Sequence, residues 1–125
     1  MPKTIVGKQV APVENKALFD DKGLVPAIIQ GAHTKQVLML GYMNEESLKR
    51  TLTTGHVWFY SRSRQELWEK GGTSGNFLNV KRVQIDCDND AVLVQAEPDG
   101  PTCHTGAVAC WFTDLQAEGL KAGRK

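Results

Sequence analysis

The segment Asp86-Cys87-Asp88-Asn89-Asp90 is the feature of this sequence that most restricts the fold. Side chains of an extended chain alternate between two faces, so Asp86, Asp88 and Asp90 share one face and Cys87 points to the other. Three carboxylates at this spacing repel one another unless a cation, an arginine or solvent relieves the repulsion. The segment therefore predicts either a solvated hairpin turn or an oxygen-ligand site for a hard cation such as Mg²⁺.

The chain has three cysteines, Cys87, Cys103 and Cys110, and no Cys-x-x-Cys pair. An odd number of thiols cannot pair fully within one chain. One interpretation is small thiols buried in a core, and the other is a Zn²⁺ site with three thiolates and one open position for water. Because Cys87 and the aspartates face opposite sides of one strand, either a twisted turn or a second chain would have to complete one of the sites.

Length and charge restrict the class of protein. A chain of 125 residues corresponds to one domain, and its net charge of +1 comes without a basic block. This argues against a general binder of nucleic acids or membrane surfaces, which needs a positive field. No run approaches the roughly 18 apolar residues of a membrane span. The segment Met1–Thr4 lacks the apolar core of a signal peptide, so we expect a cytoplasmic protein with reduced thiols.

The pattern of elements predicts an α+β fold: a single compact domain with a mostly antiparallel sheet and one main helix. Asn44 as N-cap and Gly55 as the terminating glycine predict that helix over residues 45–54. Pro26 suggests that its strand lies at a sheet edge, and the apolar run 36–43 suggests burial on both faces. We expect strands at 24–30, 36–43, 56–61, 77–86, 91–97 and 108–112, a short helix near 14–19 and a polar loop at 61–75. The expected division is an N-terminal arm (1–19), a domain (20–112) and a polar, frayed tail (113–125).

The polar loop and His104 are the remaining candidates for chemistry. The loop combines cations and hydroxyls with glycines, which suits an anionic ligand, although a flexible charged loop is the simpler interpretation. Its candidate ligand-binding residues are Arg62, Arg64, Lys70, Thr73, Ser74 and Asn76. His104 follows Cys103 directly, and is either a surface residue or a general base for a water bound to zinc.

Five motifs, in this order, resemble phosphoribosyl-AMP cyclohydrolase, the enzyme of the third step of histidine biosynthesis. The resemblance covers roughly residues 20–112. The motifs are Leu38-Met39-Leu40-Gly41-Tyr42-Met43-Asn44, Ser61-Arg62-Ser63-Arg64, Trp68-Glu69-Lys70-Gly71-Gly72-Thr73-Ser74-Gly75-Asn76, Asp86-Cys87-Asp88-Asn89-Asp90 and Gly100-Pro101-Thr102-Cys103-His104-Thr105-Gly106.

The resemblance implies hydrolysis of the N1–C6 bond in the adenine ring of 1-(5-phosphoribosyl)-AMP, which gives a phosphoribosyl-formimino-carboxamide ribonucleotide. It also implies a homodimer with metal sites at the interface, where the two chains share the ligands of Zn²⁺. A water activated by this Zn²⁺ would attack with the assistance of Mg²⁺. By match, Cys87, Cys103 and Cys110 would bind Zn²⁺, and Asp86, Asp88 and Asp90 would bind Mg²⁺. His104 would be the catalytic base, and the loop residues named above would contact the nucleotide.

One departure and two rival functions accompany this resemblance. Members of the family often have an acid where this chain has Gly72; if that acid assists proton transfer, another group such as Glu69 must serve here. A zinc nucleoside deaminase would need His-x-Glu and Pro-Cys-x-x-Cys, and the sequence contains neither. A structural or sensor zinc dimer without catalysis would leave the aspartates and the polar loop unexplained.

Overall fold

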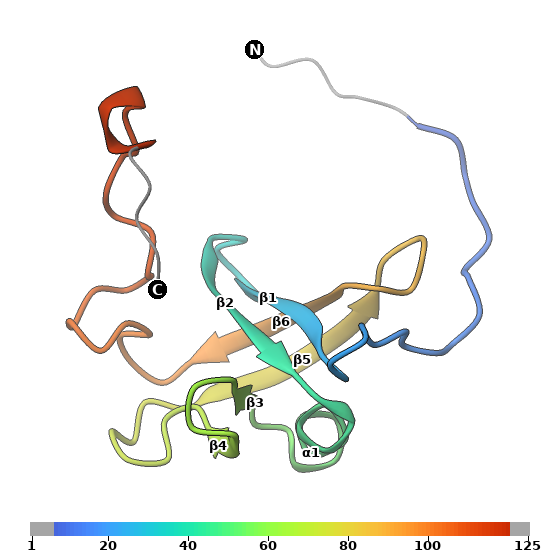
Figure 1. The fold of residues 1–125 in the computed structure, drawn as a ribbon, viewed down its shortest axis with the longest axis horizontal. Helices are drawn as coiled ribbons and strands as arrows, with labels where there is room; N and C mark the ends of the chain where they lie inside the picture. The colour runs from blue at the N-terminus through green and yellow to red at the C-terminus, as the bar shows by residue number, and fades with distance from the viewer. Residues whose placement is uncertain (1–6, 121–125) are drawn as a thin grey trace.

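The computed structural model describes residues 7–120, which form two sheets, one α-helix and one 3₁₀-helix (Figure 1). Four strands form one sheet in the order β2-β1-β6-β5, and β3 and β4 form a separate two-stranded sheet. The elements are β1 (Val25–Gly31), β2 (Val37–Met43), α1 (Glu45–Thr54), β3 (Trp58–Ser61), β4 (Glu66–Glu69), β5 (Leu78–Ile85), β6 (Val92–Pro98) and η1 (Ala117–Leu120). The predicted α+β class is confirmed.

The sheet is mostly antiparallel, as expected, with one parallel pairing that the sequence did not indicate. β1 pairs antiparallel with β2, and β5 pairs antiparallel with β6. β6 then lies parallel to β1, with Ala27 opposite Val92. The turn between β5 and β6, which carries the aspartates, and the loop after β6, which carries Cys103, therefore lie at opposite ends of one central strand (Figure 1).

Helix α1 has the bounds that its capping residues predict. The Asn44 side chain accepts a hydrogen bond from the Ser47 N–H at 2.9 Å, and the Ser47 hydroxyl accepts one from the Asn44 N–H at 2.9 Å. Gly55 ends the helix in the left-handed region, at φ 78°. This reciprocal capping box satisfies two backbone donors that would otherwise lack partners at the helix start.

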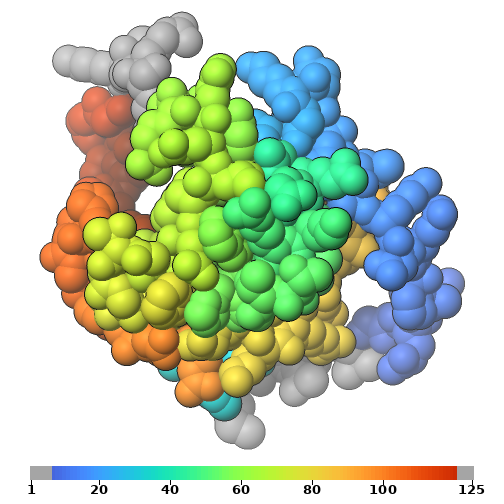
Figure 2. Space-filling model, turned by 90° about the horizontal axis from the view of Figure 1, so that it is seen from below, coloured from blue at the N-terminus to red at the C-terminus, as the bar shows by residue number. Residues whose placement is uncertain are grey.

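The helix and the β3–β4 hairpin cover the same face of the large sheet, and Figure 2 shows them side by side. Val25, Ala27 and Ile29 point into this core and are fully buried. Gly41 has no side chain because the Phe59 ring occupies the place where a Cβ would stand. The opposite face of the sheet is open, since Ile28 and Leu40 are 36% and 41% exposed.

Two predictions about strand environment were wrong. β1 is an interior strand, although Pro26 suggested an edge. The missing N–H is tolerated because pairing with β6 begins only at Ala27. β2 is an edge strand with one open face, so Val37 and Leu40 are exposed rather than buried on both faces.

Three predictions about local structure were also wrong. The expected loop 61–75 contains β4, whose Leu67 and Trp68 pair with β3. The described residues 108–112 form no strand; a single bond, from the Cys110 N–H to the Leu38 carbonyl at 2.8 Å, ties this segment to β2. The described residues 14–19 form no helix, because Asn89 binds their backbone. The rest of the predicted arm and tail, residues 1–6 and 121–125, lies outside the described residues.

Candidate active site

The turn between β5 and β6 gathers the three aspartates that the sequence singled out. Oδ1 of Asp86 accepts hydrogen bonds from the N–H groups of Asp90 at 3.0 Å and Ala91 at 3.2 Å. One carboxylate oxygen from each of Asp86, Asp88 and Asp90 lies within 4.8 Å of the others. All three are exposed, and among residues 7–120 they are the one group of three or more acids, histidines or cysteines this close together.

The electrostatics of the turn match a cation site. Despite desolvation, hydrogen bonds from the backbone of Asp90 and Ala91 hold the pKa of the Asp86 carboxyl below its ordinary value. A hydrogen bond shared with Asp88, desolvation and the nearby negative charges raise the pKa of Asp90 to about 6. The three carboxylates therefore favour a bound positive charge. Oxygen donors of this kind fit Mg²⁺, which prefers hard ligands.

Cys103 and Cys110 form a pair of neighbouring thiols after β6. The Thr105 hydroxyl donates to Sγ of Cys103 at 3.1 Å. This bond and one from the Thr105 N–H hold the pKa of the Cys103 thiol below its ordinary value. Cys110 is exposed as a residue, but desolvation of its sulfur and the contact with Cys103 raise the pKa of its thiol. The positive charge of Lys70 lowers the pKa of both thiols. It therefore favours thiolate on Cys103 and opposes the rise in pKa at Cys110.

Cys87 does not join this pair within one chain. It lies in the turn before β6, whereas Cys103 lies in the loop after that strand. A strand of seven residues is roughly 20 Å long, far beyond the distance between ligands of one metal ion. One described chain therefore brings together two of the three predicted zinc ligands. His104 is exposed and lies next to the pair rather than next to Cys87.

The predicted nucleotide-binding residues divide into two groups. Arg62 and Arg64 lie at the turn of the β3–β4 hairpin. The Arg62 guanidinium stacks over the Tyr42 ring at 4.0 Å, and Arg64 pairs with Glu66 at 3.5 Å. The other group, Lys70, Thr73, Ser74 and Asn76, belongs to the glycine-rich loop after β4.

The glycine-rich loop packs against the loop that carries the thiol pair. Gly71 has φ 92°, and its α-carbon approaches the backbone of Asn76 so closely that a side chain would collide there. The Asn76 side chain in turn fills the place where a Cβ of Gly100 would stand. Figure 2 shows the two loops side by side. Asn76 thus joins the two loops, and the charge of Lys70 acts on both Cys103 and Cys110.

Sequence reasoning missed three features of these loops. Thr105 supports the Cys103 sulfur; the spacing Cys-x-Thr in a turn is a signal that could have indicated it. His56 Nδ1 lies 3.0 Å from a Glu69 carboxylate oxygen, a pair that connects distant positions and has no local signal. Asn89 is buried among exposed aspartates, which only the position of the arm explains.

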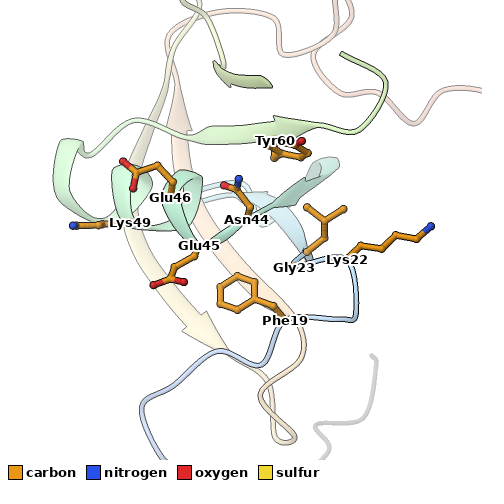
Figure 3. A pocket seen from close by; sticks show the side chains of 9 residues that line it. Phe19, Lys22, Gly23, Asn44, Glu45, Glu46, Lys49 and Tyr60 are labelled. Carbon is orange, nitrogen blue, oxygen red and sulfur yellow. The ribbon is translucent and has the colours of Figure 1, made fainter. Parts of the chain in front are cut away.

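The two larger pockets among the described residues lie away from the residues of the candidate site. One, of about 600 Å³, opens at the start of α1, where Figure 3 shows Phe19 and Tyr60 on either side of Asn44. The other, of about 660 Å³, lies between the arm, α1 and β5. Neither is lined by a predicted metal ligand or by a predicted nucleotide contact.

Fold and site together define a small α+β protein with a carboxylate centre at one end of a central strand and a thiol pair at the other. The sequence model of one family, described as phosphoribosyl-AMP cyclohydrolase, matches residues 39–112. This chain belongs to that family, which confirms the resemblance seen in the sequence.

The relatives compared are named "Histidine biosynthesis bifunctional protein HisIE". The protein of Caldanaerobacter subterraneus subsp. tengcongensis is 57% identical over 100 residues, 80% of this chain and 49% of its own length. The Bacillus subtilis protein is 57% identical over 106 residues, 85% of this chain and 50% of its own length. The Vibrio cholerae protein is 57% identical over 96 residues, 77% of this chain and 46% of its own length. The chain thus spans about half the length of these relatives.

Proposed function

We propose that this chain opens the adenine ring of 1-(5-phosphoribosyl)-AMP by hydrolysis of the N1–C6 bond, in the third step of histidine biosynthesis. One observation carries the proposal: in a member of this family, the charge of Lys70, in the cationic glycine-rich loop, acts on both thiols of the pair beside His104. Thiols can hold a metal that activates water, and the loop can hold a phosphorylated ligand beside it. The proposal includes a cytoplasmic location. Among residues 7–120, no helix has the length and apolar character of a membrane span.

The reaction needs a nucleophilic oxygen at C6 and protons for the departing nitrogen. A zinc ion held by thiolates would supply the activated water, and Mg²⁺ would reduce the charge of the phosphates. C6 is electrophilic because alkylation of N1 leaves positive character on the ring. In this proposal the His104 imidazole accepts a proton from the water and returns it as the N1–C6 bond breaks. Lys70, Thr73, Ser74 and Asn76 bind the phosphates through donors that the loop exposes.

The proposal requires a homodimer, because one chain supplies only two neighbouring thiols. A two-fold axis near the middle of β6 would exchange the ends of that strand and bring Cys87 of the partner subunit to Cys103 and Cys110. Exposed apolar surface supports such an association. Trp111 and Phe112, next to Cys110, are 61% and 63% exposed, and the open sheet face adds Ile28 and Leu40. Surface of this kind is typical of an interface.

Metal content and ring opening, measured together, test the function. Purified protein should carry about one Zn²⁺ per chain and convert phosphoribosyl-AMP only with Mg²⁺ present. Cys103→Ala should lose both zinc and activity. Asp88→Ala should keep its zinc but need more Mg²⁺, which separates the two centres. Protein that is loaded with zinc and leaves the substrate unchanged would instead support a structural or sensor dimer.

A further inference from the structure

Asn89 is buried within an otherwise exposed turn. Only 8% of it is exposed, whereas Asp86, Asp88 and Asp90 on either side are exposed. It adopts φ 66°, a left-handed conformation that asparagine tolerates better than most residues. Its own N–H donates to the Asp86 carbonyl at 3.1 Å. This residue therefore belongs to the acidic turn, yet its side chain points away from solvent.

The N-terminal arm is what buries Asn89. The two N–H groups of its amide donate to the carbonyls of Glu14 at 2.8 Å and Lys16 at 2.6 Å. Its own carbonyl accepts from the Leu18 N–H at 2.7 Å. These three bonds join residues more than seventy positions apart in the sequence. Both amide protons are used, so no other side chain of this size could make the same contacts.

The arm has few other attachments near the turn. Residues 7–16 are exposed, and Ala17 and Phe19 are the arm residues that pack against the core. Between the arm and the sheet lies the pocket of about 660 Å³, so the arm does not rest closely on β5 there. The position of the arm over the turn thus depends on Asn89.

We propose that Asn89 is a positioning residue for the Mg²⁺ centre and that it couples binding of the cation to order in the arm at residues 14–18. This inference rests on the proposed function, which assigns Mg²⁺ to the aspartates. Three carboxylates whose oxygens lie within 4.8 Å repel one another, and the turn must hold them together before a cation arrives. Three hydrogen bonds from Asn89 to the arm restrict the turn, and a preformed site binds more tightly than one that must first be ordered.

Coupling of this kind is reciprocal. If order in the arm strengthens binding of Mg²⁺, then Mg²⁺ must strengthen order in the arm by the same factor. The Leu18 N–H, which Asn89 holds, reports on the arm directly. Its hydrogen exchange should slow when Mg²⁺ is added to the 125-residue chain.

The test uses Asn89→Gly, which keeps the left-handed backbone and removes the two side-chain bonds. Asn15→Ala is the control, because the Asn15 side chain makes no hydrogen bond among the described residues and alanine, unlike glycine, does not loosen the backbone of the arm. Titration with Mg²⁺ alone, followed by calorimetry, should show binding on the order of tenfold weaker for Asn89→Gly and unchanged for Asn15→Ala. At saturating Mg²⁺ the kcat of Asn89→Gly should return to that of the parent protein. If Asn89→Gly fails to fold, Leu18→Pro replaces it in the test. This substitution removes the N–H donor on the arm and should weaken Mg²⁺ binding in the same way.

The outcomes separate this inference from the function it rests on. If the parent protein binds Mg²⁺ and opens the ring, and folded Asn89→Gly binds Mg²⁺ equally well, the positioning role is wrong while the function stands. The same conclusion follows if exchange at Leu18 does not respond to Mg²⁺. If the parent protein binds no Mg²⁺, both the assignment of the aspartates and the role of Asn89 are overturned.

Discussion

Complementation between two inactive cysteine variants tests the separation of the thiols along β6. Cys87→Ala removes the thiol before the strand, and Cys110→Ala removes a thiol after it. Each variant alone should have no complete zinc site and no ring-opening activity. If a zinc site takes Cys87 from one chain and the thiol pair from the other, a mixed dimer has one site that combines both substitutions and one intact site.

The size of the rescue follows from this geometry. In an equimolar mixture with free exchange, half of the dimers are mixed, and each mixed dimer has one intact site of two. The mixture should therefore recover about one quarter of the sites of the parent protein. Zinc content and ring-opening rate should both rise from near zero to that fraction. A mixture of Cys103→Ala with Cys110→Ala is the control, because both lesions lie in the same thiol pair and no site is restored.

The reasoning would be refuted by a mixture that exchanges subunits, as native mass spectrometry of labelled chains can verify, and yet recovers neither zinc nor activity. That result would mean that all three thiols meet within one chain, through a movement of roughly 20 Å, or that Cys87 binds no zinc. Substantial zinc in Cys87→Ala alone would support the second of these explanations.

Further predictions concern three single groups. His104→Ala should retain both metals and lose on the order of a hundredfold in kcat, and a variant with full activity would exclude His104 as the base. The pKa of Asp90 is raised to about 6 in the folded protein, so a proton competes with the cation below that pH and Mg²⁺ affinity should fall as the pH decreases from 7 to 5. Because the pKa of Asp90 is higher in the folded than in the unfolded chain, protonation of Asp90 stabilises the metal-free fold at low pH. This stabilisation is complete below the ordinary pKa of 3.8 and is lost as the pH rises through about 6. Asn44→Ala should lower stability by about 1 kcal/mol, or Tm by about 4 °C, in thermal unfolding, whereas Thr53→Ala on the exposed helix surface should change little.

Local signals explain which parts of the fold could be predicted from the sequence. The ends of α1 depend on Asn44 and Gly55, residues that act within one turn of their own position, and both bounds were right. The β5–β6 hairpin was equally local. β4 was missed because its four residues are recognisable only by their pairing with β3. The interior position of β1 was missed because parallel pairing with β6 joins segments more than sixty residues apart.

The candidate site shows the same limit. The carboxylates of Asp86, Asp88 and Asp90 lie together, as their spacing suggested, although they do so in a turn rather than along an extended segment. The contact of the glycine-rich loop with the loop after β6 could not be predicted, since it depends on how Asn76 packs against Gly100. The roles of the site residues in binding metals and the nucleotide remain predictions. The boundaries of the arm, domain and tail at residues 19 and 112 also remain predictions.

Strand β6 connects the two centres. β5 ends at Ile85, so the aspartates and Cys87 follow in the turn before β6. From there β6 carries the chain to the thiol pair, where Thr105 and Lys70 favour thiolate on Cys103. Under the proposed function, this separation would leave the aspartates to a hard cation and Cys87 to the thiol pair of a partner subunit, so dimerisation would complete the thiol centre without disturbing the carboxylate centre.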